Sequence, residues 1–263
     1  MAKKIVFVSG KGGVGKTTVV SNLGVQLAKR GKNVVLIDAD IGLNNLDVVM
    51  GVENKVVYDI LDVLEGRCRL KQALIKGENL PSLSILASAH FGAGHISAAE
   101  MRLIVANLDS LFDYVLIDSP AGIDNGFHRA VSGAGEAYVI VSPNISSVRD
   151  ADKVISLLNT YRLDNVGLII NRVRGDLIML GETMSVDDIT KLLKIIPTGV
   201  IPEDDEVSLC TCIGRAVEGN GEAAEAFSLL AENFLTGRNK QYDCLAKYKT
   251  FWGRVKLKKR AKA

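Results

Sequence analysis

The stretch SGKGGVGKTT, at residues 9–18, constrains the fold more than any other feature of the sequence. Within it, Gly10–Thr17 has the form G-x-x-x-x-G-K-[ST], whose glycines let backbone N–H groups turn toward a phosphate chain. The stretch follows a strand-like run, IVFVS, and opens a helical pattern, which is the context that a phosphate-binding loop requires. The predicted phosphate contacts are Gly10, Lys11, Gly12, Gly13, Val14, Gly15, Lys16, Thr17 and Thr18.

Two side chains at the end of this loop have separate expected roles. We expect the Lys16 ammonium to reach the β- and γ-phosphates of a nucleotide, and the Thr17 hydroxyl to ligate Mg²⁺. The alternative is a glycine-rich turn that binds nothing, and the strand and helix on either side argue against it. The sequence therefore predicts a site for a nucleotide and Mg²⁺.

Short β-branched runs alternate with helical patterns over most of the chain, which is typical of a parallel sheet built from βαβ units. The predicted strands are Ile5–Ser9, Asn33–Asp38, Leu83–Leu86, Tyr114–Asp118, Ala137–Ser142, Val166–Ile170 and Gly199–Ile201. The predicted helices are Thr17–Arg30, Ser97–Phe112, Ser147–Tyr161 and Glu222–Phe234. The expected fold class is α/β, a three-layer P-loop NTPase fold with a mostly parallel sheet flanked by helices, plus a C-terminal amphipathic helix.

Length and composition fit one large domain followed by a tail. With 263 residues and 48% hydrophobic composition, the chain can bury a full core. The first break in composition falls near residue 237, so we predict a P-loop nucleotide-binding domain at 1–236 and a linker with a basic amphipathic tail at 237–263. No signal peptide and no run of about 18 apolar residues is found, which favours a cytoplasmic protein. The four cysteines are expected to be reduced thiols, and a metal role for Cys210 and Cys212 is the alternative.

Three aspartates follow strand-like runs. Asp38 and Asp40 come after VVLI, and Asp118 comes after YVLI. Because the carboxyl ends of parallel strands line the ligand crevice, we expect all three near the phosphates. Asp38 and Asp118 are predicted to hold Mg²⁺, through water molecules, and a capping role is the ordinary alternative for each. Pro120 and Gly122 are expected to form a loop that senses the γ-phosphate.

The extra lysine of the loop, Lys11, gives it the form K-G-G-x-G-K-[ST]. This form resembles the deviant Walker A loop of the MinD/ParA family of P-loop ATPases. The resemblance implies ATP as the nucleotide and a homodimer in the ATP-bound state, in which Lys11 reaches the partner's phosphates and hydrolysis requires dimerisation. Such a charge acts as an arginine finger does, by neutralising charge on the transferring phosphoryl group. The alternative is that Lys11 binds phosphate within its own subunit.

The same resemblance implies roles for several further residues. Lys11, Lys16, Asp40 and Asp118 would be the catalytic residues, with Asp40 orienting the attacking water and Asp118 linked to Mg²⁺. Asn171 would read the adenine edge, with Pro202 and Glu203 beside the base. Whether Asp40 is a general base or only positions water stays open, and an asparagine at a strand end is often only a turn former.

Other segments are similar to the septum-site-determining MinD branch of the family, over about residues 1–235. They are DIGLNNLD at 40–47, VVYDI at 56–60, QALIK at 72–76, DSPAGI at 118–123, SSVRDAD at 146–152 and GVIPED at 199–204. The resemblance implies a protein that positions the division site by recruiting a MinC-like inhibitor and blocking FtsZ ring formation away from midcell. A MinE-like activator or a polar anchor is the further partner that it implies. Asp152 is either near the dimer and partner surface or simply solvated.

The tail has a basic and aromatic composition. Residues 245–263 hold eight basic and no acidic residues. The net charge of +2 is therefore the sum of +8 for this segment and −6 for residues 1–244. On a helix, one broad face would hold Leu245, Tyr248, Phe251, Trp252 and Val255. This pattern predicts an interfacial helix that binds anionic lipids at the inner face of the bacterial cell membrane. A helix packed on the body and a solvated basic tail are the alternatives.

Three other functions share parts of these signals. A ParA-type partition ATPase that binds DNA shares the loop and the basic tail, but the aromatic tail residues are not needed on a phosphate-tracking surface, so nucleic acid is not the expected partner. A flagellar-number ATPase usually has an extension before the first strand, whereas here that strand begins by Lys4. An iron protein needs paired cysteines near the loops that contact the phosphates. Cys210 and Cys212 instead follow Pro202 and Glu203, which are expected beside the adenine.

Overall fold

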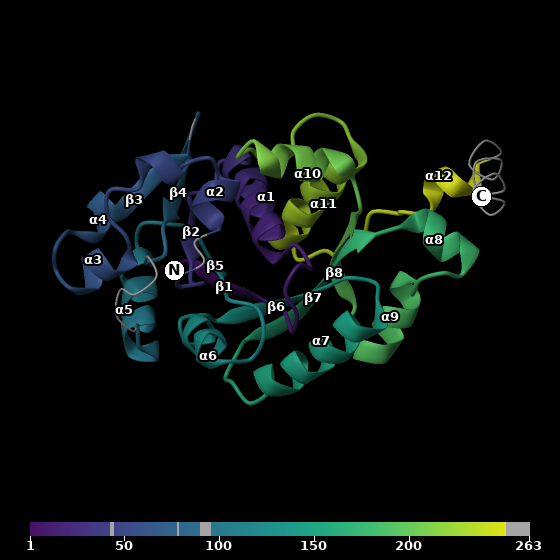
Figure 1. Cartoon of the computed structure of the whole chain (residues 1–263), viewed down its shortest axis with the longest axis horizontal. Coiled ribbons are helices and arrows are strands. Elements are labelled where there is room, and N and C mark those ends of the chain that lie inside the picture. Colours follow the sequence, from purple (N-terminus) through teal and green to yellow (C-terminus); the bar gives the residue numbers. More distant parts are fainter. Residues whose placement is uncertain (43–44, 78, 90–95, 251–263) are drawn as a thin grey trace.

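The computed structural model describes residues 1–42, 45–77, 79–89 and 96–250. Its centre is an eight-stranded sheet with the strand order β3-β4-β2-β5-β1-β6-β7-β8 (Figure 1). The strands are β1 (Lys3–Val8), β2 (Val34–Asp38), β3 (Leu74–Gly77), β4 (Leu80–Leu86), β5 (Tyr114–Asp118), β6 (Glu136–Val141), β7 (Asn165–Val173) and β8 (Pro197–Pro202). Only β3 pairs in the antiparallel direction among the described residues.

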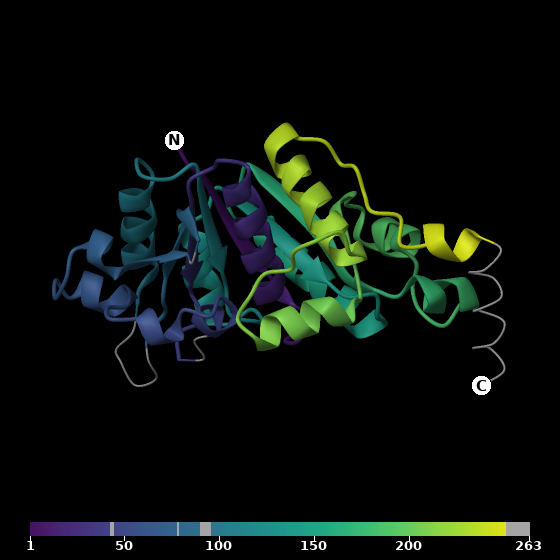
Figure 2. The same cartoon turned by 90° about the horizontal axis from the view of Figure 1, so that it is seen from above.

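Helices cover both faces of the sheet and make it the middle of three layers. One face packs against α1 and α11, which lie side by side (Figures 1 and 2), and the other packs mainly against α5, α6, α7 and α9. These helices are α1 (Lys16–Lys29), α5 (Ala98–Leu108), α6 (Asn125–Ser132), α7 (Ile145–Leu158), α9 (Val186–Leu193) and α11 (Glu222–Thr236). Alternate strand residues enter opposite layers: Ile5 and Phe7 face α1 and α11, and Val6 and Val8 face the other helices.

Shorter helices fill the connections between these elements. They are α2 (Leu46–Val49), the 3₁₀ turn η1 (Glu53–Lys55), α3 (Ile60–Leu64), α4 (Leu70–Ala73), α8 (Gly175–Leu180), α10 (Asp205–Cys212) and α12 (Ala246–Lys249). The structure confirms the α/β fold class, the seven predicted strands and the four predicted helices, with ends that differ by a few residues. β3, the eight-residue helices α6 and α9 and the short helices of the connections were not predicted, because elements of this length have too few residues to display a clear period.

The predicted tail helix is described only at its start. The single turn α12 ends at Lys249, and Thr250 has extended backbone angles (φ −75°, ψ 159°). Phe251, Trp252 and Val255 lie outside the described residues, so the predicted lipid-facing surface stays a prediction. Across the described ranges, no helix combines the length and the apolar character that spanning a bilayer takes.

Asn233, a buried side chain in the last turn of α11, helps to fix the chain that follows this helix to the body. Asn233 donates from its amide nitrogen to the carbonyl oxygens of Thr198 and Lys240, both at 2.8 Å, and accepts from the Lys240 N–H at 3.1 Å. The amide thereby joins the last turn of α11 to β8 and to the following segment. That segment continues to Cys244, whose side chain is buried in the core.

We predict that Asn233→Ala lowers the free energy of unfolding by about 1–3 kcal/mol, because it removes the three hydrogen bonds that join the end of α11 to Thr198 and Lys240. The measurement is urea unfolding followed by circular dichroism. Asn239→Ala is the matched control, since Asn239 is exposed in the same segment. Equal midpoints for the two variants would contradict a structural role for the Asn233 amide.

Candidate nucleotide-binding site

The predicted phosphate-binding loop connects β1 to α1 and is shaped by glycines. Gly13 and Gly15 have left-handed φ angles of 81° and 85°, and Gly15 is the N-cap of α1. A Cβ atom at Gly15 would lie 2.4 Å from the Asn171 side-chain nitrogen, so only glycine fits there. Asn171 itself donates to the Val14 carbonyl oxygen at 2.8 Å. The loop therefore presents the amino end of a long helix, which favours anions.

Lys16 and Thr17 both contact Asp118, at the carboxyl end of β5. The buried Lys16 ammonium pairs with one carboxylate oxygen of Asp118, and the Thr17 hydroxyl donates to the other at 2.6 Å. Because β1 and β5 are neighbours in the sheet, the loop and Asp118 meet at the same edge. The structure thus brings together three of the predicted site residues.

Asp38 lies beside Asp118, because these residues are paired in the register of β2 and β5. Burial and the negative charge of Asp118 raise the pKa of Asp38 to about 7. Its carboxylate accepts from the backbone N–H groups of Asp40 at 2.9 Å and Leu46 at 3.2 Å. Asp38 therefore also fixes the course of the chain that carries Asp40.

Asp40 is only partly buried and lies within the field of several charges. Burial raises the pKa of Asp40, the positive charge of Lys16 lowers it, Asp118 raises it, and Arg129 on α6 lowers it. The carboxylate is thus close to the lysine that is expected to bind phosphate. Its predicted role toward water remains a prediction.

The donor set at this edge fits Mg²⁺. Thr17, Asp38 and Asp118 offer a hydroxyl and two carboxylates, the hard oxygen ligands that this ion prefers. In the described ranges, no group of three or more His, Cys, Asp or Glu side chains is arranged to hold a metal. The Thr17, Asp38 and Asp118 set has only two carboxylates, and Mg²⁺ usually takes one or two carboxylates and completes its shell with water and phosphate oxygens.

Lys11 has a different environment from Lys16. Its exposed ammonium donates to the Ser146 hydroxyl at 3.1 Å, at the start of α7. The loop approaches α7 closely, because a Cβ at Gly10 would lie 2.7 Å from the Asp150 backbone. Lys11 is therefore held at the surface on the α7 side of the loop.

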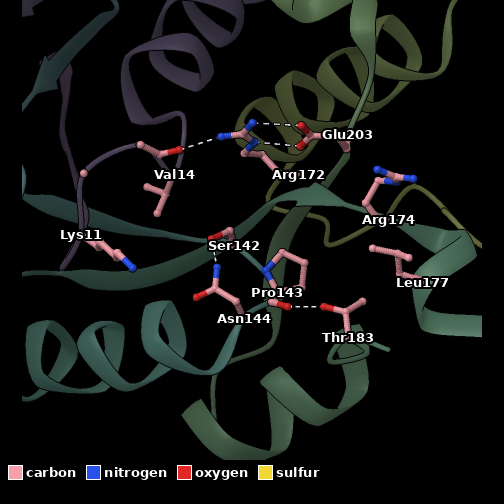
Figure 3. Close-up of a pocket in the computed structure, with 12 residues that line it drawn as sticks. Lys11, Val14, Ser142, Pro143, Asn144, Arg172, Arg174, Leu177, Thr183 and Glu203 are labelled. Carbon is pink, nitrogen blue, oxygen red and sulfur yellow. Dashed lines mark hydrogen bonds and ion pairs between the residues drawn. The ribbon is translucent and has the colours of Figure 1, made fainter. Parts of the chain in front are cut away.

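A pocket of about 360 Å³ opens beside the loop, between the ends of β6, β7 and β8 (Figure 3). It is lined by Lys11, Gly12, Gly13, Val14, Ser142, Pro143, Asn144, Arg172, Arg174, Leu177, Thr183 and Glu203. Of the three predicted base contacts, Glu203 lines this pocket, whereas Asn171 and Pro202 do not. The Asn171 amide is instead engaged with the loop backbone.

Arg172 is a central residue of this pocket that was not predicted from the sequence. Its left-handed φ of 61° is unusual for a residue with a side chain. The guanidinium donates to the Gly13 carbonyl oxygen at 2.9 Å and to both Glu203 carboxylate oxygens at 2.8 and 3.0 Å (Figure 3). Arg172 thus joins the phosphate-binding loop to the end of β8. Its only signal in the sequence is its place at the end of an apolar strand.

A helix-opening glycine loop with its lysine, threonine and strand-end aspartates, on a three-layer α/β sheet, defines a P-loop nucleotide-binding protein. The CobQ/CobB/MinD/ParA nucleotide binding domain family matches residues 5–216. The septum site-determining protein MinD of Bacillus subtilis (strain 168) is 42% identical over 265 residues, covering 96% of this chain and 99% of that protein.

Two solved structures show the same relationship. The MinC:MinD cell division protein complex of Aquifex aeolicus contains a chain with a TM-score of 0.85 and 42% identity, covering 91% of this chain and 98% of that one. MinD complexed with Mg-ADP from Pyrococcus horikoshii OT3 has a TM-score of 0.79 and 30% identity, covering 95% and 100%. The chain belongs to the MinD branch of the MinD/ParA family of P-loop proteins.

The raised pKa of Asp38 predicts a pH-dependent stability. Because the pKa is about 7 in the folded chain and ordinarily 3.8, folding takes up a proton between these values. The free energy of unfolding therefore falls as the pH rises toward and through 7. Relative to Asp38→Asn, the wild type should lose about 2 kcal/mol or more between pH 5 and pH 8.

This difference is measured by urea unfolding at several pH values, without nucleotide or Mg²⁺. Comparing pH slopes cancels any constant cost of the substitution. Asp152→Asn, which removes an exposed carboxylate on α7, is the control and should follow the wild type. Parallel profiles for the wild type and Asp38→Asn would show that Asp38 ionises normally in the folded chain.

Proposed function

We propose that this protein is an ATP-dependent, dimerising ATPase that associates peripherally with the inner face of the bacterial cell membrane and positions the division site. The observation that carries the proposal is the match, over nearly the whole chain, to septum site-determining MinD proteins. The structure of a MinC:MinD complex adds support, because its MinD chain is similar to this one over 91% of the present chain. A MinC-like inhibitor of FtsZ ring formation is the partner that we propose.

The proposed reaction is hydrolysis of ATP to ADP and phosphate at the loop. Lys16 binds the β- and γ-phosphates, and the phosphate oxygens compete with Asp118 for its charge. Thr17 and, through water, Asp38 and Asp118 would hold Mg²⁺, which would supply positive charge beside the transferring phosphoryl group. Asp40 orients the attacking water, and Asn171, Pro202 and Glu203 bind the adenine. Arg172 holds Glu203 in place for this contact, because its guanidinium bonds to both the Gly13 carbonyl oxygen and the Glu203 carboxylate.

Dimerisation places a second lysine at each site. Lys11 is exposed and lies on the α7 side of the loop, which supports a role toward a second subunit. In the dimer, its ammonium stabilises charge on the partner's phosphates as an arginine finger does. The ATP-bound protein is therefore the dimer, and hydrolysis returns it to the monomer.

The membrane step depends on the tail, which we place at 237–263, after the ATPase domain at 1–236. Each basic residue contributes about 1 kcal/mol at most near an anionic bilayer, and few apolar side chains are available, so one tail binds weakly. Two tails on one dimer add a factor on the order of 10² to 10⁴ through avidity. ATP binding thus brings the protein to the membrane, and a MinE-like activator or a polar anchor sets where it stays.

Lys11→Ala tests the dimer-dependent reaction. We expect ATP to bind with near-normal affinity, because Lys16 and the loop N–H groups remain, whereas the ATP-dependent dimer is lost. Hydrolysis should fall by a factor on the order of 10² or more. The measurements are light scattering for mass and phosphate release for rate, with Lys191→Ala on the exposed face of α9 as the control. Hydrolysis at the wild-type rate in Lys11→Ala would remove the trans role.

Liposome co-sedimentation with ATP, ADP and no nucleotide tests the membrane step. Binding to anionic vesicles should require ATP and be lost in Trp252→Glu. Leu192→Glu is the matched control, since it places the same charge on an exposed apolar residue of the body. Binding that ignores the nucleotide would contradict the proposal. Salt-sensitive DNA binding without vesicle binding would favour a ParA-type partition ATPase instead.

A further inference from the structure

Arg129 on α6 extends a charged side chain toward the loop that carries Asp40. Its guanidinium donates to the carbonyl oxygens of Ala39 at 3.3 Å and Ile96 at 3.5 Å. The third guanidinium nitrogen, Nε, is buried and has no hydrogen-bond partner within the described residues. A buried cationic donor without a partner lowers the stability of the fold. Helix packing alone therefore does not account for Arg129 at this position.

Asp40 is the negative charge whose field acts on this guanidinium. Burial lowers the pKa of Arg129, and the charge of Asp40 opposes that change. Conversely, Arg129 is one of the two positive charges that lower the pKa of Asp40, the other being Lys16. Across the described ranges, no direct hydrogen bond joins Arg129 to Asp40. The two groups are thus close enough for their charges to interact, and Ala39 is the backbone contact between them.

The loop after Asp118 and the Arg129 guanidinium both approach Gly126. Gly126, in the first turn of α6, packs on Pro120, because a Cβ there would lie 2.5 Å from the Pro120 ring and 3.4 Å from Arg129 Nη2. Gly126 therefore provides the space in which the ring and the guanidinium both fit. One side chain thus bonds to the loop that carries Asp40 and lies beside the loop that follows Asp118.

We propose that Arg129 is a positioning residue, which fixes the Ala39–Asp40 backbone and holds the Asp40 carboxylate toward the attacking water. The inference rests on the proposed ATP hydrolysis, in which Asp40 orients that water. Arg129 makes no hydrogen bond to the phosphate-binding loop within the described residues. Its removal should therefore slow the chemical step and leave nucleotide binding nearly unchanged.

The competing explanation is that Arg129 only stabilises the loops through the Ala39 and Ile96 carbonyls. A purely structural role would lower the melting temperature and weaken nucleotide binding. It would also slow hydrolysis by the same factor whether or not Asp40 is present. A positioning role acts through Asp40, so its effect should disappear once the carboxylate is gone.

The test is a double-mutant cycle of Arg129→Gln and Asp40→Asn, with ATP hydrolysis measured in the presence of anionic vesicles. Arg129→Gln alone should lower kcat about tenfold or more, as expected for loss of a hydrogen-bonded charge, with KM within about threefold of wild type. In the Asp40→Asn background, it should lower kcat by less than about twofold. Arg102→Gln removes an exposed arginine of α5 as the matched control and should change neither constant.

ADP affinity, melting temperature and ATP-dependent dimer mass are measured on every variant, and they should stay close to wild type for Arg129→Gln. Arg129→Lys, which retains the charge, should recover part of the lost kcat. Equal losses of kcat in both backgrounds, or a loss that appears in KM, would overturn the inference and leave the proposed function intact. A wild type that does not hydrolyse ATP would overturn the proposed function, and the role of Arg129 with it.

Discussion

The buried ion pair between Lys16 and Asp118 is the interaction on which the rest of the site depends. Removing a cation and a carboxylate from water is costly, and the cost is recovered only when the two groups are paired and further hydrogen-bonded. Here the Thr17 hydroxyl occupies the second oxygen of Asp118. The pairing requires β1 and β5 to be neighbours, since one leads into the loop and the other ends at the aspartate. The strand order of the sheet is therefore tied directly to the chemistry at its edge.

The second carboxylate at this edge, Asp38, explains why the site suits a divalent cation. Two buried carboxylates in adjacent strands repel each other, and the pKa of Asp38 rises to about 7 as a result of burial and of this repulsion. A metal ion that shared both groups would remove this repulsion, so the proposed binding of Mg²⁺ would relieve an electrostatic cost that the folded chain carries. The electrostatic repulsion that lowers the stability of the folded chain therefore lies at the proposed metal site. The backbone N–H groups of Asp40 and Leu46 limit that cost by bonding to the same carboxylate.

The sequence predicted the sheet well, because buried parallel strands such as VVLID and YVLID are continuous apolar runs that end in a polar residue. Likewise, the loop and Asp38 and Asp118 are local motifs whose meeting follows from one rule about strand ends. The four-residue strand β3, the eight-residue helices α6 and α9 and the short helices were missed, because elements this short display no clear period and their conformation depends on neighbours in space. The contacts of Arg172 with Gly13 and of Arg129 with Ala39 join residues 159 and 90 positions apart, and no spacing rule reaches that far. Asn171, predicted from the resemblance to contact adenine, bonds to the Val14 carbonyl instead, and its role toward the base is still a prediction.

The two lysines of the loop differ in the free energy that moving them would cost. Lys16 is buried and paired, so any new partner must replace Asp118 without leaving either charge alone. Lys11 is exposed and makes a single side-chain hydrogen bond to Ser146 within the described residues, and a surface contact of this kind is worth little. An exposed cation can therefore exchange its partner at almost no cost, whereas a buried one serves a fixed position. In the proposed dimer, this difference in burial is the physical reason why Lys16 would hold a phosphate at a fixed position and Lys11 could turn toward a second subunit.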